Sequence, residues 1–438
     1  MKYFKIAKNL SIFLLSISLY SQSYTGLATD NFSGIHGLLS NPANVVDSRM
    51  RTDVNIASAS AFLGSDYFGL SLKDIFRDDI DFDQVTRFPK DKNNFFTTID
   101  IMGPSFMFNL NKTNSIGLIT RVRGINNINN LNGNLFESIE EGFDEDQDYT
   151  FNSEDLTSTA HIWAEVGITY GRVLYNEADH FLKAGITLKL LQGGGANFIN
   201  SPGLSGSYDA SAQTLATTGS LNYGASEAFD SNDSSDFNNL STGFGADIGF
   251  IYEWRKGNTS SAQADNKYLL KLGLSITDIG SINYKNSTFS NYDLNNTVSS
   301  TTNFNDTDDF LDDNYSFTET RTTAKIKLPT AINLSADYHL NNKIYVSLLS
   351  SFSLIKSNTE LSNKINNSVT IAPRLETKWF SFYSPISFRQ YDDFAWGAGI
   401  RFGPLTVGSG SILTNLISDT SKTADVFFGL KVPIYQKK

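Results

Sequence analysis

Apolar and polar residues alternate one by one along most of this chain, and this alternation limits the possible fold more than any other feature. In residues 424–434, one face of an extended strand would carry Ala424, Val426, Phe428, Leu430, Val432 and Ile434. The same alternation occurs in residues 181–191, 268–278 and 331–340, where charged side chains recur on the second face. Successive side chains of a strand point to opposite faces, so a period of two predicts β-strands.

The order of the segments predicts a barrel. About 14 segments have this period, namely residues 54–72, 97–109, 114–123, 158–175, 180–193, 243–255, 268–278, 331–340, 344–356, 368–378, 380–390, 394–402, 404–412 and 424–434. Connections after odd-numbered segments include the long stretches 73–96, 124–157, 194–242 and 279–330, whereas those after even-numbered segments are mostly tight, apart from residues 256–267. Outer-membrane barrels have short periplasmic turns and long extracellular loops.

We therefore predict an all-β fold, a transmembrane antiparallel β-barrel of about 14 strands over residues 54–438, with the four long connections as extracellular loops. A mean hydropathy of −0.23 is too polar for a bundle of membrane helices but suits strands that face lipid on one side only. A soluble secreted adhesin remains the alternative, because its sheets would also alternate.

Residues 1–21 have the features of a secretory signal peptide. Lys2, Lys5 and Lys8 precede an apolar run over residues 10–19, which is shorter than the ~18 residues of a membrane helix. Cleavage after Ser21 is expected, and a buried N-terminal helix is the alternative. The protein is thus predicted to be exported to the cell outer membrane.

Residues 22–53 lack sustained alternation and are predicted to form a small hatch inside the barrel, near its periplasmic end. A disordered periplasmic tail is the alternative. In this stretch, Asn41 fits the N-cap of a helix and Pro42 fits its first position. We expect Asn41, Pro42 and Ala43 to lie close to the barrel wall at Gly103 and Pro104.

Charge and composition exclude several classes of function. The net charge of −11 disfavours nucleic-acid binding, which depends on Lys and Arg. The chain has no cysteine, which excludes disulfides and thiolate chemistry. The four histidines lie in separate segments without the spacing of a metal or catalytic site. No enzymatic activity, metal or cofactor is therefore predicted.

Two acidic runs, within residues 140–148 and 306–313, leave two interpretations open. Their carboxylates could bind calcium weakly, but neither run has the spacing and the glycine of an EF-hand loop. Solvated acidic loops are the alternative.

Three stretches resemble known outer-membrane families. Phe427-x-Gly429-x-x-Val432-x-Ile434 resembles the terminal-strand signal read by barrel-assembly machinery, although Phe427 is not polar. The Asn-Pro-Ala motif at residues 41–43, with the glycines before it, resembles the hatch of FadL-like long-chain fatty-acid transporters and of the related PorV-type barrels. Residues 394–410 and 423–433 are similar to an uncharacterised Bacteroidetes family of FadL-like outer-membrane proteins. These resemblances imply a plugged barrel in the outer membrane and no particular substrate.

Charged residues on the polar face of the strands are expected to point into the lumen. The candidates are Arg121, Glu165, Lys183, Asp247, Lys271, Asp337, Arg374, Glu376 and Arg401. Mixed charges fit two interpretations, a closed interior of ion pairs that holds the hatch or a polar path for a solute.

Gly103 and Pro104 interrupt the second predicted strand. Proline removes a hydrogen bond of the sheet, so a bulge or a lateral gap is expected there. In FadL-like proteins a strand kink beside the plug gives a side exit, so the resemblance implies passage of small hydrophobic or amphipathic molecules. The alternative function is a non-transporting accessory subunit of an outer-membrane assembly or protein-secretion complex. The expected partners are outer-membrane lipid and either such a solute or other outer-membrane barrel proteins, and no nucleic acid.

Overall fold

The computed structural model describes residues 24–75, 85–141, 143, 146–227, 241–255, 268–299, 307–341, 343–391 and 393–435. Residues 1–21, the predicted signal peptide, lie outside this part of the chain. The described helices are η1 (Gly34–Leu39), η2 (Pro42–Val45), α2 (Leu72–Ile75), α3 (Gly133–Glu141), α5 (Thr307–Asn314) and α6 (Ile412–Ile417). None of them is long and apolar enough to cross a membrane.

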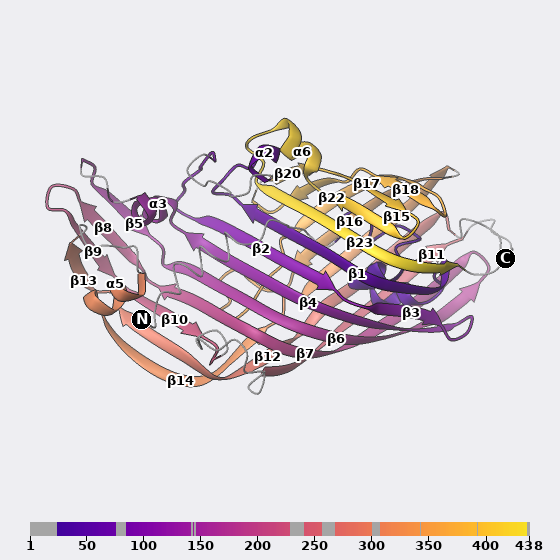
Figure 1. The fold of residues 1–438 in the computed structure, drawn as a ribbon, viewed down its shortest axis with the longest axis horizontal. Coiled ribbons are helices and arrows are strands. Elements are labelled where there is room, and N and C mark those ends of the chain that lie inside the picture. Colours follow the sequence, from indigo (N-terminus) through magenta and orange to yellow (C-terminus); the bar gives the residue numbers. More distant parts are fainter. Residues whose placement is uncertain are drawn as a thin grey trace.

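The main sheet closes on itself as an antiparallel barrel (Figure 1). Its wall consists of β1 (Met50–Ser65), β2 (Asn93–Met102), β3 (Ser105–Asn109), β4 (Asn114–Leu131), β6 (Asp155–Glu177), β7 (His180–Pro202), β11 (Ser241–Trp254), β12 (Leu270–Asp293), β15 (Ala331–Asn341), β16 (Ile344–Ser353), β17 (Ser368–Glu376), β18 (Phe380–Tyr383), β19 (Ile386–Arg389), β20 (Asp393–Trp396), β21 (Ala398–Phe402), β22 (Leu405–Ser409) and β23 (Thr423–Tyr435). With the interrupted strands β2/β3, β18/β19 and β20/β21 counted once each, the described chain forms a 14-strand barrel, closed by pairing of β1 with β23. The predicted fold class is confirmed.

The two ends of the barrel differ. Tight connections such as residues 110–113, 178–179 and 403–404 share one end, which we call the turn end. The long connections lie at the other end, which we call the loop end. In an antiparallel ring successive connections must alternate between the ends, so this arrangement follows from the strand order.

Several strands extend beyond their predicted limits at the loop end. β12 continues to Asp293, where it pairs with β10 (Ser220–Ala225) and β14 (Ser316–Lys327), although residues 194–242 and 279–330 were expected as loops. At the turn end, β1 begins at Met50 rather than at residue 54, and thus includes the last residues of the predicted hatch. The alternation fades in the extensions because neither of their faces needs to be uniformly apolar.

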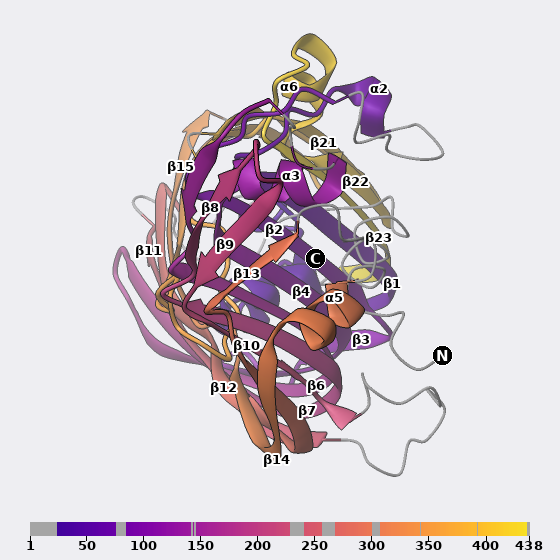
Figure 2. The same cartoon turned by 90° about the vertical axis from the view of Figure 1, so that its left-hand side faces the viewer.

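A second sheet lies at the loop end, formed by β5 (Tyr149–Asn152), β8 (Ser205–Asp209), β9 (Thr214–Thr218) and β13 (Asn296–Ser299). Figure 2 shows it with α3 and α5 in front of the barrel wall. It has a small apolar core of its own, which includes Phe151, Tyr208, Leu215, Val298 and Phe310.

The outside of the wall is apolar and much of the inside is polar. Cross-strand neighbours Leu274 and Leu334, and likewise Leu348 and Ile371, are 44–45% exposed on the outer face. Asp337, on the inner face of the same sheet, is fully buried. Toward the loop end the inner face becomes apolar, with Trp163, Ile282 and Leu328 in one cluster.

Candidate functional site

Residues 24–49 lie inside the barrel, where inward-facing side chains of the wall bind them at both ends of the segment; we call this segment the hatch. Near its start, the Asp30 carboxylate accepts from Arg401 at 3.0 Å, and Glu376 accepts from the Asn31 side chain at 2.8 Å. Near its end, Asp47 pairs with Arg255 at 2.6 Å.

Backbone carbonyls of the hatch are also bound by buried lysines. Lys183 donates to the Val46 carbonyl at 2.8 Å. Lys431 donates to the carbonyls of Phe32 and Ser33, each at 2.7 Å, and pairs with Asp53 at 3.2 Å. The barrel thus holds the main chain of the hatch as well as its side chains.

A row of glycines on three neighbouring strands receives the Asn-Pro-Ala motif. Gly171, Gly185 and Gly249 are directly paired across β6, β7 and β11. A Cβ atom added at Gly185 would lie 2.4 Å from the Pro42 carbonyl carbon, and one at Gly249 would lie 2.2 Å from the Asn41 amide oxygen. Only glycine lets the backbone of the hatch approach the wall this closely.

The local structure of the motif follows its sequence. Asn41 caps η2 by accepting from the Ala43 N–H at 3.0 Å, and Pro42 occupies the first helical position. The helix is a single 3₁₀ turn. The Asn41 amide also donates to the carbonyls of Phe250 and Leu274, at 3.1 and 3.2 Å.

We expected Asn41, Pro42 and Ala43 to lie close to Gly103 and Pro104. The contacts of the motif are with other strands of the wall. The motif packs on β7 and β11, where Gly185 and Gly249 leave room for it, and the Asn41 amide donates to the Leu274 carbonyl of β12.

His36 connects the hatch to the interruption instead. The Ser58 hydroxyl donates to Asn55 and is bonded to His36 Nε2 at 2.8 Å. Asn55 donates to the carbonyls of Met102 and Gly103, at 3.3 and 2.9 Å.

The strand is interrupted at Gly103 and Pro104, and β2 ends and β3 begins there. The opening in the hydrogen-bond ladder is filled locally. Besides the Asn55 amide, the Ser105 hydroxyl accepts from the Thr120 N–H at 2.9 Å, and the Thr120 hydroxyl donates to the Pro104 carbonyl at 3.0 Å.

The predicted lumen residues all lie on the inner face, and most of them are paired. Arg121 pairs with Glu165 at 2.6 Å and with Asp100 at 2.9 Å. Asp247 pairs with Lys189 at 2.7 Å, and Lys189 also pairs with Asp278.

A second charged group surrounds Arg374. Its guanidinium pairs with Asp337 and with Glu376, both at 2.8 Å. Tyr268 donates a short hydrogen bond to Asp337. Lys271 lies further away, 3.7 Å from Asp337. The structure therefore supports the interpretation of an ion-paired interior around the hatch for most of these charges.

Residues 354–367, between β16 and β17, turn inward at the loop end and cross toward β4, β6 and β14. The Asn363 side-chain amide donates to the Thr159 carbonyl at 2.9 Å, and Asn363 Oδ1 lies 3.2 Å from His161 Nδ1. The Lys364 N–H donates to Asn127 at 2.9 Å. We call residues 354–367 the inner loop.

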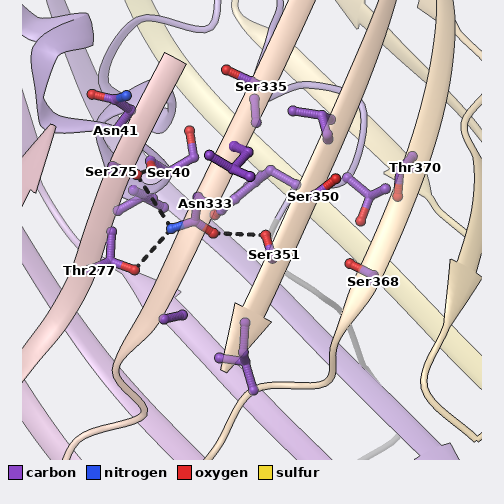
Figure 3. A pocket seen from close by; sticks show the side chains of 18 of the residues that line it. Ser40, Asn41, Ser275, Thr277, Asn333, Ser335, Ser350, Ser351, Ser368 and Thr370 are labelled. Atoms are coloured by element: carbon purple, nitrogen blue, oxygen red, sulfur yellow. Dashed lines mark hydrogen bonds between the residues drawn. The ribbon is translucent and has the colours of Figure 1, made fainter. Parts of the chain in front are cut away.

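A cavity of about 210 Å³ lies between the hatch and the inner loop. Figure 3 shows its polar wall, where β12, β15, β16 and β17 present hydroxyl and amide groups. Asn333 donates to Thr277 at 3.1 Å and accepts from Ser351 at 2.7 Å. Other parts of the lining are apolar, and they include Leu39, Phe96, Ile125, Ile251, Leu349 and Ile365.

Burial and neighbouring charges shift the pKa values of His36 and Asp30 in the hatch. Burial, with the nearby Lys431, lowers the pKa of His36 to about 3, so the imidazole is neutral at physiological pH. Burial opposes ionisation of Asp30, but the Arg401 guanidinium outweighs it, and the pKa of Asp30 lies below its ordinary value.

Sequence reasoning missed several of the residues that build this site. Asp30, Asp53 and Lys431 tie the hatch to the wall, and Asp100 and Asp278 complete the charged network. Asp100 and Lys431 lie in predicted strands, so their charge on the polar face could have identified them. The position of the inner loop carried no such signal.

The described residues contain no group of three or more His, Asp or Glu side chains suited to a metal ion. Parts of both acidic runs, including residues 144–145 and 306, lie outside the described residues. Weak calcium binding by these runs stays a prediction.

Comparisons with known proteins give a family and a set of structural likenesses. The sequence model of a family described as "Family of unknown function (DUF5723)" matches residues 42–410. No curated protein matches the chain. A Pseudomonas aeruginosa FadL homologue aligns at 9% identity over 95% of this chain and 98% of its own, with a TM-score of 0.45. The Ralstonia pickettii toluene transporter TbuX aligns at 7% identity over 92% and 94%, with a TM-score of 0.44.

The Pseudomonas putida toluene transporter TodX aligns at 9% identity over 95% of this chain and 96% of its own, with a TM-score of 0.43. The resemblance to PorV-type barrels and to a Bacteroidetes family is not tested by these comparisons and stays a prediction.

Proposed function

Because this chain belongs to DUF5723, a family of unknown function, we propose a function from its own geometry: it is an outer-membrane barrel that passes small amphipathic molecules through its central cavity. The observation that carries the proposal is the cavity between the hatch and the inner loop, with a hydroxyl-rich wall on one side and apolar side chains on others. A space of this size is larger than the voids of a close-packed interior, few of which exceed a water molecule.

The outer face supports a location in a membrane. Large apolar side chains around the wall, such as Leu274, Leu334 and Ile371, are exposed on the outside, where a soluble barrel would carry polar residues. Export by the predicted signal peptide points to the outer membrane.

The size and lining of the cavity indicate the size and polarity of a solute that would fit. An apolar cavity of about 150 Å³ holds one benzene molecule, so about 210 Å³ suits a single ring or a short chain with a polar group. Two of the cations in the lining, Arg121 and Arg123, are already paired with carboxylates and offer little to an ionic solute. The third, Lys271, contacts the hatch and lies 3.7 Å from Asp337. An uncharged or weakly polar head group would bind the hydroxyls and the Asn333 amide.

The test is uptake by a strain that lacks the gene, complemented with variants. Labelled single-ring alcohols, toluene and a medium-chain fatty acid would be offered at limiting concentration. Ser351→Trp fills the cavity and should abolish uptake of the transported compound, whereas Phe352→Trp, on the outer face of the same strand, should not. Unchanged uptake of every compound in the deletion strain would contradict transport.

Membrane placement has an independent readout. The closed ring of strands should give heat-modifiable mobility on gels, because it has no free edge at which unfolding begins. Mobility that is the same with and without boiling would contradict the barrel in its membrane form.

One observation favours the alternative function. The second sheet, with α3 and α5 and a core of its own, is a folded platform at the loop end rather than a set of solvated loops. Such a platform suits an accessory subunit that binds another outer-membrane barrel. Gentle extraction and affinity purification should then recover a second barrel in equal amount, and this recovery should be lost when residues 205–218 are replaced by a short linker.

A further inference from the structure

We propose that a solute leaves the central cavity through the hatch to the turn end, past a constriction formed by Lys271 and Asn44, and not sideways through the wall at Gly103 and Pro104. This inference rests on the proposed function and goes beyond it, because it assigns the route and the residue that controls it.

The first observation is that two cavities meet at these residues. A smaller cavity of about 40 Å³ lies toward the turn end, between the hatch and β7, β11 and β12. Asn44 and Lys271 line both it and the central cavity. One residue belongs to the hatch and the other to β12, so together they separate the two spaces.

The second observation is the way in which Lys271 is held. Its ammonium is 3.3 Å from the Thr29 carbonyl, 3.3 Å from the Asn31 side-chain oxygen and 3.7 Å from Asp337. Other cations that hold the hatch make closer contacts, such as Lys431 at 2.7 Å and Arg255 at 2.6 Å. A long, flexible side chain whose partners are distant can be displaced at smaller cost than one with close partners.

The third observation concerns the competing route. The Asn55 amide, the Ser105 hydroxyl and the Thr120 hydroxyl fill the hydrogen-bond positions left open at Gly103 and Pro104. In the described part of the chain, neither Gly103 nor Pro104 lines the central cavity. The sequence hypothesis of a lateral gap therefore gives way to a sealed bulge.

The absence of cysteine from the sequence allows a direct test. A single Ser335→Cys substitution places a thiol in the central cavity, and its rate of modification by a small charged methanethiosulfonate reports access from water. In the folded, detergent-solubilised barrel, Lys271→Ala should raise this rate by at least roughly tenfold, the equivalent of a barrier lowered by about 1.4 kcal/mol. Lys271→Arg keeps the positive charge and leaves the constriction filled, and should label at the original rate.

Two further variants keep the proposal falsifiable if Lys271→Ala does not fold. Asn44→Ala opens the same constriction from the hatch side and should also accelerate labelling. Asn55→Ala opens the bulge at Gly103 and should have no effect. Heat-modifiable mobility confirms that each variant is folded.

The proposal is overturned if neither Lys271→Ala nor Asn44→Ala accelerates labelling, or if Asn55→Ala alone does. Labelling does not depend on transport, so a failure of the proposed route can be told apart from a failure of the proposed function. Accelerated labelling without solute uptake would contradict the proposed function and leave the route intact, whereas uptake with unchanged labelling would do the reverse.

Discussion

The glycine row under the hatch leads to a quantitative prediction. At Gly185, an added Cβ would lie 2.4 Å and 2.5 Å from the carbonyl carbon and oxygen of Pro42 and 2.6 Å from the Ala43 nitrogen. These are backbone atoms, which cannot move aside as a flexible side chain can. Overpacking of this kind costs about 1–3 kcal/mol. Gly185→Ala should therefore weaken the seating of the hatch by that amount without breaking the barrel.

The matched control is Gly194→Ala on the same strand. There the added Cβ would have its nearest neighbours at 3.5–3.9 Å, which is ordinary contact. Gly194→Ala should leave the free energy that holds the hatch in place nearly unchanged.

The assay measures how often the hatch opens. Both variants are made in an Ala43→Cys background, whose own labelling rate is the reference, and residue 43 is fully buried when the hatch is seated. If opening is fast relative to modification, the labelling rate follows the open population. It should rise roughly 5- to 150-fold for Gly185→Ala. An equal rise for Gly194→Ala, or none for Gly185→Ala, would refute the role of the glycine row.

Three other predictions concern the wall and the charges. Leu334→Arg should cost about 2–4 kcal/mol near the bilayer midplane, whereas Leu340→Arg, nearer the turn end, should cost less than about 1 kcal/mol, both measured by refolding into lipid vesicles. The pKa of His36 is about 3, below its ordinary value, so the unfolded chain binds a proton before the folded chain does as the pH falls from about 6.5. The free energy of unfolding, followed by melting curves, should therefore drop between pH 6.5 and 3, and it should drop less in His36→Gln. Arg401→Met should cost about 3–5 kcal/mol by leaving Asp30 buried and unpaired, and Asp30→Asn should restore most of it in thermal melts.

The sequence predicted the barrel well where the outer face of its wall is apolar. The outer face of a membrane strand must be apolar, so residues such as Leu274 and Leu334 show the period of two. Residues 316–323 of β14 are exposed to solvent and meet no such demand, so the strand was expected as part of a loop.

The site was harder to predict for a physical reason. The inner loop is rich in Ser, Asn and Lys residues, and such a composition is found in solvated loops as well as in segments that lie in a polar lumen. The glycine row was present in the predicted strands, but its meaning depends on the register that brings Gly171, Gly185 and Gly249 side by side. Register between strands and the path of an irregular segment are set by tertiary contacts.

Closure of the ring bears on the order of assembly. β1 pairs with β23 from Met50 and Tyr435 at one limit to Gly64 and Thr423 at the other, so the wall cannot be completed until β23 has arrived. The same strand carries Lys431, whose ammonium holds the Phe32 and Ser33 carbonyls. A folding intermediate that lacks only this strand would have both an open seam and a loosely held hatch. Completion of the wall and completion of the lysine contacts with the hatch therefore depend on the same strand, the last of the barrel.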